Sequence, residues 1–434
     1  PKDAFANGIG MIHQHFKLVD VLTAAENIVL GLPGKLDLKA ASAKIREICD
    51  KYGFSVDPAQ KIYDMSVSQK QTVEIVKVLY RGADILILDE PTAVLTPQET
   101  DKLFAVLRNM RNDGKAIVII THKMHEVEAL SDRVAILRHG QFIGDMLTAH
   151  TNAQEMTNMM VGHAVSLNIE RPDPVDPKPR IEVKGLTVRS VDGIVKLDDV
   201  SFTANSGEIL GIAGISGCGQ KELLEAIAGL QTVESGSISY IEDDGSREEL
   251  IGKDPLSIAE LGVSLSFVPE DRLGMGLVGN MNLADNMMLR SFRRGKSIFT
   301  DRRSPRALAE SVVQELSVST PSVDTPVRRL SGGNVQKVLV GREIASAPTV
   351  LLTAYAVRGL DIHSSYTIYD LINRQKKAGV AVIFVGEDLD VLLELCDRIL
   401  VLCGGKVSGI VSGRGAEKRE VGMMMTKLGG QSHE

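Results

Sequence analysis

The sequence predicts an α/β fold made of two tandem copies of one domain, each with a mainly parallel sheet. Apolar runs that end in polar residues, such as residues 85–90, are typical of strands in a parallel sheet. Motifs also recur at a constant distance: Asp132-Arg133 reappears as Asp397-Arg398, and 397 − 132 = 265. A fixed offset along a chain indicates a repeated domain.

The same offset of 265 holds across more than 60 residues, as shown by the pairs Ser66 and Ser331, Asp89 and Ala354, and His122 and Glu387. Upstream the offset shrinks to 286 − 27 = 259 for Asn27 and Asn286, and to 270 − 14 = 256 for Gln14 and Glu270. The second copy is therefore expected to carry small insertions.

The domain boundary is expected at a proline-rich segment. Residues 170–180 contain four prolines in eleven positions, which disfavours helix and sheet and favours an extended linker. We expect a first domain at 1–162, a linker at 163–179 and a second domain at 180–434. The second copy has 270 − 180 = 90 residues before Glu270, and the first has 13 before Gln14, so roughly 75 residues are expected to be missing from its front.

Composition excludes several classes of protein. The net charge is −7, and basic residues are scattered, so no broad positive field favours nucleic acid or anionic lipid. The four cysteines have neither metal-ligand spacing nor a disulfide pattern. No apolar run approaches the roughly 20 residues that a membrane-spanning helix needs.

The segment 85–92, ILILDEPT, predicts a strand buried on both faces that ends in Asp89 and Glu90. Ligands of open α/β sheets bind at the carboxyl ends of strands. One carboxylate there can hold a metal ion while its neighbour faces an attacking water, the two roles that phosphoryl transfer needs. Taken alone, the segment also fits a core strand with a polar end.

Two further polar residues are expected at the same edge of the sheet. His122 follows the predicted strand 116–120, and Gln14 leaves an earlier short strand. Each by itself also fits an ordinary loop or helix-capping residue. The convergence of Gln14, Asp89-Glu90 and His122 on one edge favours a catalytic site.

The other expected elements of the first copy are helices at 37–52 and 97–112, and a helix from Ser66, as N-cap, to about residue 80. In the second copy we expect strands at 181–188, 195–202 and 208–213.

Residues 214–221, GISGCGQK, follow the last of these strands and match the spacing of the phosphate-binding loop GxxxxGK[ST]. Its glycines, Gly214, Gly217 and Gly219, allow backbone N–H groups to approach phosphate. Gln220 stands where the loop has lysine, and Lys221 stands where it has the Mg²⁺-binding hydroxyl. The cradle is therefore expected without its usual chemistry, although Lys221 is still a candidate phosphate contact.

The remaining catalytic positions are also replaced in the second copy, which has Ala354, Tyr355, Glu387 and Glu270. The opposite holds at residues 330–334, where Ser331, Gly332, Gly333 and Asn334 keep two glycines at a predicted helix start. The first copy has Val67 and Ser68 there. Glycines at a helix N-terminus let an anion approach closely, and a Cβ obstructs it.

These motifs resemble the ATP-binding cassette (ABC) family. LSGGN (330–334) is similar to its signature motif, ILILDE (85–90) to its second nucleotide motif, Gln14 to its glutamine loop, and His122 to its switch histidine; GISGCGQK (214–221) is similar to a degenerate phosphate loop. The resemblance implies P-loop NTPase domains, each with a helical subdomain and an antiparallel β subdomain. It also implies ATP and Mg²⁺, head-to-tail pairing of the two cassettes, and Mg²⁺ at Asp89.

Tandem cassettes with a degenerate second half resemble the ATPase subunits of bacterial importers for simple sugars and nucleosides. MIHQHFKL (11–18) and LSGGNVQKVLVGRE (330–343) are more similar to the nucleoside branch. The resemblance implies two membrane permeases and an extracellular substrate-binding protein as partners, and a position on the cytoplasmic face of the membrane. A pentose or hexose importer, a soluble tandem cassette acting on ribosomes or DNA, and a scaffold without turnover are the alternatives; the short proline-rich linker disfavours nucleic acid.

With head-to-tail pairing, the substitutions separate into two sites. One site combines Glu90 as the base, Asp89, His122, Gln14 and the first phosphate loop, which is expected to be among the missing residues, with the intact Ser331–Asn334. The other combines Gln220, Lys221, Ala354 and Glu387 with the altered residues 65–69. We expect one competent site and one degenerate site.

Overall fold

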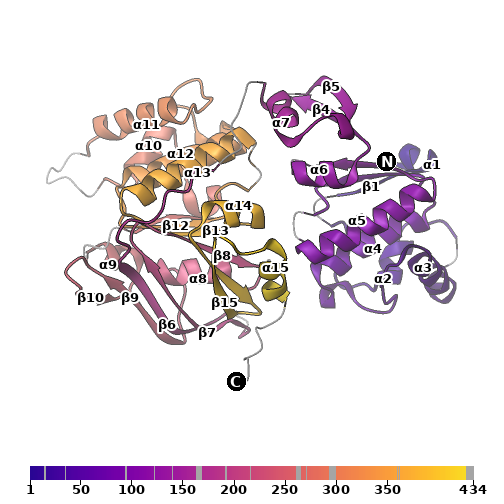
Figure 1. Ribbon diagram of the computed structural model, residues 1–434, viewed down its shortest axis with the longest axis horizontal. Coiled ribbons are helices and arrows are strands. Elements are labelled where there is room, and N and C mark those ends of the chain that lie inside the picture. Colours follow the sequence, from indigo (N-terminus) through magenta and orange to yellow (C-terminus); the bar gives the residue numbers. More distant parts are fainter. Residues whose placement is uncertain are drawn as a thin grey trace. The chain divides into compact units, whose positions relative to one another are not determined.

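The computed structural model describes residues 1–13, 16–34, 36–92, 95–121, 123–138, 140–162, 169–190, 193–215, 217–260, 265–269, 271–292, 300–358, 360 and 362–426. The chain divides into two compact units, Pro1–Val165 and Ser166–Glu434. Figure 1 colours them from indigo to magenta and from magenta to yellow.

The second unit is built on a six-stranded sheet with the order β11-β12-β13-β8-β14-β15. Neighbouring strands are parallel, except that β14 and β15 form an antiparallel hairpin. The strands are β8 (Ile209–Gly214), β11 (Leu265–Val268), β12 (Val350–Ala354), β13 (Ala381–Val385), β14 (Arg398–Cys403) and β15 (Lys406–Ser412).

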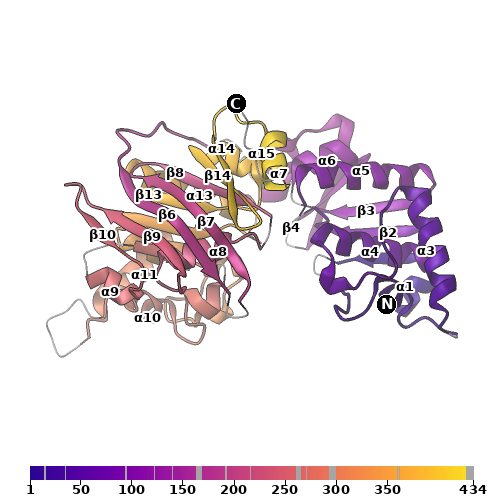
Figure 2. The ribbon, with the colours of Figure 1, turned by 90° about the horizontal axis from the view of Figure 1, so that it is seen from below.

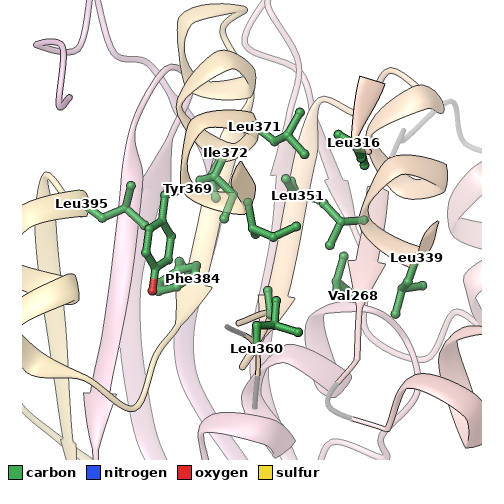
Figure 3. Packing of buried hydrophobic residues seen from close by; sticks show 14 of the residues in the cluster. Val268, Leu316, Leu339, Leu351, Leu360, Tyr369, Leu371, Ile372, Phe384 and Leu395 are labelled. Carbon is green, nitrogen blue, oxygen red and sulfur yellow. The ribbon is translucent and has the colours of Figure 1, made fainter. Parts of the chain in front are cut away.

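Two hydrophobic cores cover the two faces of this sheet, because alternate residues of each strand point to opposite sides. Leu351 and Phe384 belong to the core under the helices (Figure 3). Val350 and Leu352 belong to the core under a second, antiparallel sheet. The helices on the side of Leu351 and Phe384 are α10 (Leu283–Met288), α11 (Arg303–Glu315), α12 (Gly332–Ala345), α13 (Ile362–Lys377), α14 (Leu389–Leu395) and α15 (Lys418–Thr426).

The antiparallel sheet has the order β10-β9-β6-β7 and shares its core with α8 (Figure 2). Its strands are β6 (Pro179–Arg189), β7 (Val195–Asn205), β9 (Ser235–Ile241) and β10 (Arg247–Glu249); the helices nearby in sequence are α8 (Gln220–Ile227) and α9 (Pro255–Glu260). The predicted strands at 181–188, 195–202 and 208–213 are confirmed.

The first unit contains a parallel sheet, β1-β2-β3, and a separate antiparallel hairpin, β4-β5. Its strands are β1 (Ile9–Ile12), β2 (Ile85–Asp89), β3 (Ala116–Ile120), β4 (Arg133–Arg138) and β5 (Gln141–Leu147). Its helices are α1 (Lys2–Ala6), α2 (Ala24–Val29), α3 (Leu38–Tyr52), α4 (Val67–Tyr80), α5 (Pro97–Asn112), α6 (Met124–Leu130) and α7 (Ala153–Val161).

The structure confirms the repeat. The starts of β2 and β12 are 350 − 85 = 265 residues apart, and those of α5 and α13 are 362 − 97 = 265 apart. The smaller offsets also hold, since β1 and β11 differ by 265 − 9 = 256 and α2 and α10 by 283 − 24 = 259. Five strands of the second unit have no counterpart among the described residues of the first unit: β8, which lies between β13 and β14, and the four strands β6, β7, β9 and β10 of the antiparallel sheet.

Local sequence explains where the helices begin. Ser66 caps α4 as predicted, and its hydroxyl accepts from the Gln69 amide at 3.3 Å. Thr96 and Glu99 form a capping box at the start of α5, with Pro97 at the first helical position. The predicted helices 37–52 and 97–112 are confirmed.

The prediction that residues 85–88 are buried on both faces is wrong for this unit. Leu86 and Leu88 are fully buried, whereas Ile85 and Ile87 are half-buried. In β3, Val118 and Ile120 are both 49% exposed. In the second unit α8 and the antiparallel sheet cover the corresponding face, and the described part of the first unit has no such layer.

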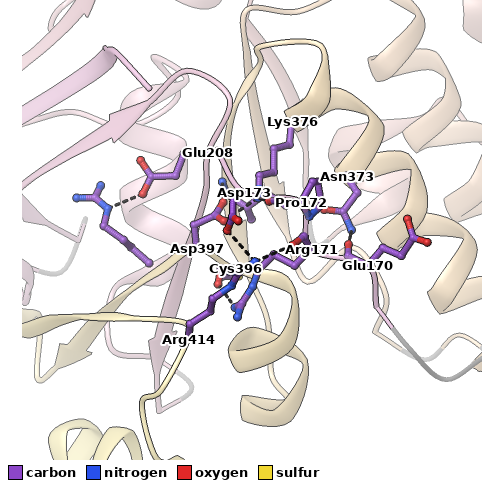
Figure 4. A network of polar contacts seen from close by, with 12 residues as sticks. Glu170, Arg171, Pro172, Asp173, Glu208, Asn373, Lys376, Cys396, Asp397 and Arg414 are labelled. Atoms are coloured by element: carbon purple, nitrogen blue, oxygen red, sulfur yellow. Dashed lines mark hydrogen bonds and ion pairs between the residues drawn. The ribbon is translucent and has the colours of Figure 1, made fainter. Parts of the chain in front are cut away.

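The described part of the proline-rich segment packs against the second unit (Figure 4). The Arg171 guanidinium donates to the carbonyls of Leu393 and Cys396 at 2.7 and 2.6 Å, at the end of α14. Lys376 donates to the carbonyl of Pro172 and to Asp397, the latter at 2.7 Å. Prolines keep the segment extended, and these bonds hold it along α13 and α14.

Candidate functional site

The ends of β1, β2 and β3 lie side by side in the first unit. Ile12 of β1 is in register with Leu88, and Asp89 is in register with Ile120 of β3. Asp89 is the last residue of β2 and is half-buried. Gln14 and His122 each come two residues after these neighbouring strand ends, but both lie outside the described residues.

Glu90 has a left-handed backbone, with φ of +45°. Its amide donates to the carbonyl of Ile120 at 2.8 Å. A residue other than glycine in this conformation is strained, and such strain is found most often at functional sites. The hydrogen bond to β3 holds the backbone at the end of β2 in place, so that Asp89 and Glu90 lie at a defined turn.

A buried carboxylate connects the loops after β2 and β3. Glu126 on α6 is 3% exposed and accepts from the hydroxyls of Thr92 and Thr121, the second at 3.0 Å. The Lys123 ammonium is 3.5 Å from Glu126 Oε1. Thr92 comes two residues after Glu90, and Thr121 directly precedes His122. Glu126 therefore fixes the chain just after Glu90 and just before His122.

The phosphate loop of the second unit has the geometry of an anion cradle. Gly217 and Gly219 have φ of +87° and +99°. A Cβ at Gly219 would lie 2.5 Å from Leu197 Cδ2 and 2.6 Å from the Lys196 carbonyl, so only glycine fits. Gly219 caps α8 without a side-chain acceptor, which leaves the N–H groups of the first turn for an anion.

Gln220 occupies part of that cradle. Its side-chain amide donates to the Ile215 carbonyl at 3.1 Å, and it is 2% exposed. A Cβ on Gly214 would be 2.6 Å from Gln220 Nε2. Lys221 lies along α8, with Nζ 3.7 Å from Glu225 Oε1. The cradle fits phosphate, but a neutral amide stands where the lysine charge would act.

Two of the other replaced positions of the second unit, Glu387 and Tyr355, contact Arg358. Its Nε is 2.9 Å from Glu387 Oε1, and its guanidinium carbon is 5.8 Å from the Tyr355 ring centre. Ala354, at the end of β12, is 1% exposed and offers no metal ligand. Glu270 lies outside the described residues. The end of β12 lacks the carboxylate oxygens that Asp89 offers at the end of β2.

The glycine loop of the second unit starts α12. Ser331 is the N-cap, its hydroxyl accepts from the Asn334 side-chain amide at 3.0 Å, and Gly332 and Gly333 form the first turn. Arg272 lies beside this loop and donates to the Gly332 carbonyl at 3.2 Å and to the Arg358 carbonyl. Burial, and then the nearby charge of Arg358, lower the pKa of Arg272.

Three of these residues were missed by sequence reasoning: Glu126, Arg272 and Arg358. The available signals were faint. Glu126 is one of several acidic residues that follow His122 in the sequence, and the two arginines follow motif residues at spacings without a known pattern. Within the described ranges, no group of three or more His, Cys, Asp or Glu side chains could hold a metal ion. Nor, in those ranges, does any helix reach the length and apolarity required to traverse a bilayer.

Comparison with known proteins places these motifs in context. The family described as "ABC transporter" matches residues 1–93 and 197–353. A nucleoside import ATP-binding protein, NupA of Lactococcus lactis subsp. cremoris (strain MG1363), is 40% identical over 100% of this chain and 85% of its own length. A guanosine import ATP-binding protein, NupO of Bacillus subtilis (strain 168), is 38% identical over 98% and 83%. A glucose import ATP-binding protein, TsgD13 of Haloferax volcanii, is 38% identical over 98% and 83%.

Proposed function

Because this chain belongs to the ABC transporter family, we propose that it is the ATP-hydrolysing subunit of an importer that carries nucleosides. The observation that carries the proposal is that the intact motifs of one ATP site are divided between the two repeats. The carboxylates Asp89 and Glu90 are kept in the first repeat, and Gly332 and Gly333 are kept in the second. Losses at random would spoil both sites, whereas these keep the carboxylates and the glycine loop of the same site.

In the proposed mechanism the two repeats pair head to tail and complete one site. Asp89 would hold Mg²⁺, which would supply positive charge at the transferred phosphoryl group. Glu90 orients the attacking water and accepts its proton. His122 contacts the γ-phosphate, and Gln14 contacts the water near the metal. Ser331, Gly332 and Gly333 close the site with hydroxyl and backbone donors, and Asn334 supports that turn.

The second site is proposed to be inactive in hydrolysis. Ala354 offers no oxygen for a metal, and Gln220 bonds to the loop backbone where a lysine would meet phosphate. The first repeat is proposed to need a strand and phosphate loop like β8 and residues 214–219, which residues 1–162 do not contain. Residues 1–434 on their own are then expected to release no phosphate.

The proposed partners are two permease subunits and an extracellular substrate-binding protein, with this subunit on the cytoplasmic face of the membrane. Closure of the ATP site would drive the permeases through the segments near Gln14 and Glu270. Relatives named for nucleoside and guanosine import support a nucleoside cargo. Relatives named for glucose and ribose import support a simple sugar as the second candidate.

The test is phosphate release by the assembled transporter carrying Glu90→Gln, with a first repeat that has been completed by a strand and phosphate loop. Loss of the proton acceptor is expected to lower turnover by about 100-fold or more. The matched control is Glu47→Gln, the same chemical change at an exposed position on α3, which is expected to leave turnover unchanged. Turnover close to wild type in Glu90→Gln would reject the assignment. Stimulation by binding protein loaded with nucleoside, and not with ribose or glucose, would identify the cargo class.

A further inference from the structure

We propose that Arg272 is the positioning residue of the glycine loop 331–334, and that Arg358 links this loop to Glu387 in the degenerate site. The proposal deepens the function given above and rests on it where hydrolysis is concerned. It assigns a role to three charged residues, none of which has a role in the hydrolysis mechanism proposed above. It also gives the degenerate site a physical connection to the glycines that serve the competent one.

The Arg272 guanidinium bridges two loops of the second unit. Nη1 donates to the Gly332 carbonyl at 3.2 Å, and Nη2 donates to the Arg358 carbonyl. A planar guanidinium presents several N–H donors in fixed directions, so it can bind two carbonyls at once and hold their spacing. Arg272 begins a π-helical turn, Arg272–Gly276, that directly follows the segment of Glu270. Three segments distant in sequence therefore meet at one side chain.

The absence of a side chain at Gly332 lets Arg272 approach without displacement. A Cβ built on Gly332 would lie 3.2 Å from Arg272 Nη1, closer than most Cβ contacts. In the first repeat both partners differ: Val67 stands at the position of Gly332, and Phe16 stands 272 − 256 = 16 at that of Arg272. The arginine and the glycine thus occur together in the repeat that keeps its glycine loop.

Arg358 extends the contact to the degenerate site. Its carbonyl accepts from Arg272, while its side chain pairs with Glu387 at 2.9 Å and lies beside the Tyr355 ring. Arg272 and Arg358 carry like charges that repel, and Glu387 offsets part of that repulsion. In the first repeat the corresponding residues are Ala93 and His122, which cannot form an ion pair with each other because alanine carries no charge.

The connection predicts that a change at Glu387 affects the glycine loop 331–334. When the Glu387 carboxylate is lost, the ion pair of 2.9 Å is broken and one restraint on the Arg358 side chain is removed. Repulsion between the two arginines then weakens the bond from Arg272 to the Arg358 carbonyl. Since the same guanidinium holds Gly332, the first turn of α12 becomes less well fixed. A change at the degenerate site is thereby transmitted to the glycine loop.

The first experiment measures hydrogen exchange of the Asn334 and Val335 amides, which bond to Ser331, in the chain without nucleotide. Arg272→Ala is expected to speed their exchange about tenfold, and Glu387→Gln about threefold. Arg272→Lys keeps the charge but not the fork, and is expected to fall between wild type and Arg272→Ala. The control Arg306→Ala removes a guanidinium that binds Asp324 with two bonds of 2.8 Å, and should leave these amides unchanged.

The second experiment measures ATP hydrolysis by the assembled transporter, again with the first repeat completed by a strand and phosphate loop. Arg272→Ala is expected to lower kcat about tenfold with little change in KM, and Arg272→Lys to restore part of it. Exchange in Arg272→Ala within twofold of wild type would overturn the positioning role, and unchanged exchange in Glu387→Gln would overturn the link. Because exchange is measured without ATP, it decides the proposal even if Glu90→Gln retains turnover and the proposed function fails.

Discussion

Glu90 and Tyr355 stand at the same position of the two repeats and share one backbone conformation. Their φ angles are +45° and +53°. Each amide donates to the carbonyl of the last residue of the next strand, Ile120 at 2.8 Å and Val385 at 3.0 Å. The turn therefore persists where the carboxylate is gone, so pairing of the strands maintains it and the side chain does not.

Stability and activity should separate at Glu90. Glu90→Val is expected to lower the free energy of unfolding by about 1–2 kcal/mol, because a β-branched residue fits a left-handed backbone poorly. Glu90→Asn, which tolerates that conformation, should change stability by less than about 0.5 kcal/mol. Urea unfolding measures both. Equal losses in the two variants would contradict a strained turn, whatever their hydrolysis rates.

The Glu126 network should show strong coupling. Glu126→Val leaves the buried Thr92 hydroxyl without its acceptor and is expected to cost about 1–3 kcal/mol of stability. The second repeat has Val357 and Val391 at these two positions. The double variant Thr92→Val with Glu126→Val copies that apolar pair, and should be more stable than Glu126→Val alone. A double-mutant cycle with additive costs would disprove the coupling.

The two positive-φ glycines of the phosphate loop should differ in their tolerance. Gly217→Ala meets open space and is expected to cost about 1 kcal/mol from backbone strain alone. Gly219→Ala adds contact with Leu197 and the Lys196 carbonyl, and is expected to cost more than about 2 kcal/mol. Chemical denaturation, followed through the unfolding transition of the second unit, measures both free energies of unfolding. Similar costs would show that the loop rearranges.

Nucleotide affinity should be restorable at residues 220 and 221. Gln220→Lys with Lys221→Thr rebuilds the GxxxxGK[ST] pattern, and is expected to tighten ATP binding at the second site about tenfold through a charge-assisted contact. A photoreactive ATP analogue followed by peptide mapping measures labelling near residues 214–221. Lys221→Thr alone is the control and should show no gain. No gain in the double variant would mean that the cradle cannot hold phosphate.

Glu394 should make stability depend on pH. Its pKa is raised, first by burial and then by Asp390 and Asp388. A carboxyl group with a raised folded-state pKa binds its proton more tightly in the folded protein, so its contribution to stability is lost as pH rises through that pKa. Glu394→Gln is therefore expected to raise Tm at pH 7–8, with the difference vanishing below about pH 4. The exposed Glu47→Gln is the control, and a Tm gain that is the same at every pH would contradict the cause given.

Local pattern predicted much of the fold, because caps and apolar periodicity are local signals. The bounds of α5 and β3 agree with the prediction, and Ser66 caps α4 as expected. The repeat was also predicted, because two copies of one domain keep the same spacing between their motifs along the chain. The half-exposed face of β2 was not predicted, since burial of a strand depends on which other segments cover it.

The candidate site was predicted only at its motif positions. Asp89 and Glu90 were placed at a strand end from the sequence, and the structure has them there. The contacts of Arg272 join residues 60 and 86 positions apart, and those of Glu126 join residues 5 and 34 apart. No periodic pattern encodes such pairs. The fold-back of Gln220 onto its own loop depends on side-chain geometry that spacing alone does not specify.

The proline-rich segment has a consequence for autonomous folding of the second repeat. Arg171 supplies donors to two carbonyls at the end of α14, and Ile169 is buried in the helical-side core. An isolated repeat cut at Pro179 would lose these contacts and leave helix-terminal carbonyls without protein donors. A truncation point before Ile169 would keep these contacts. The proline-rich segment therefore contributes to the stability of the domain that follows it.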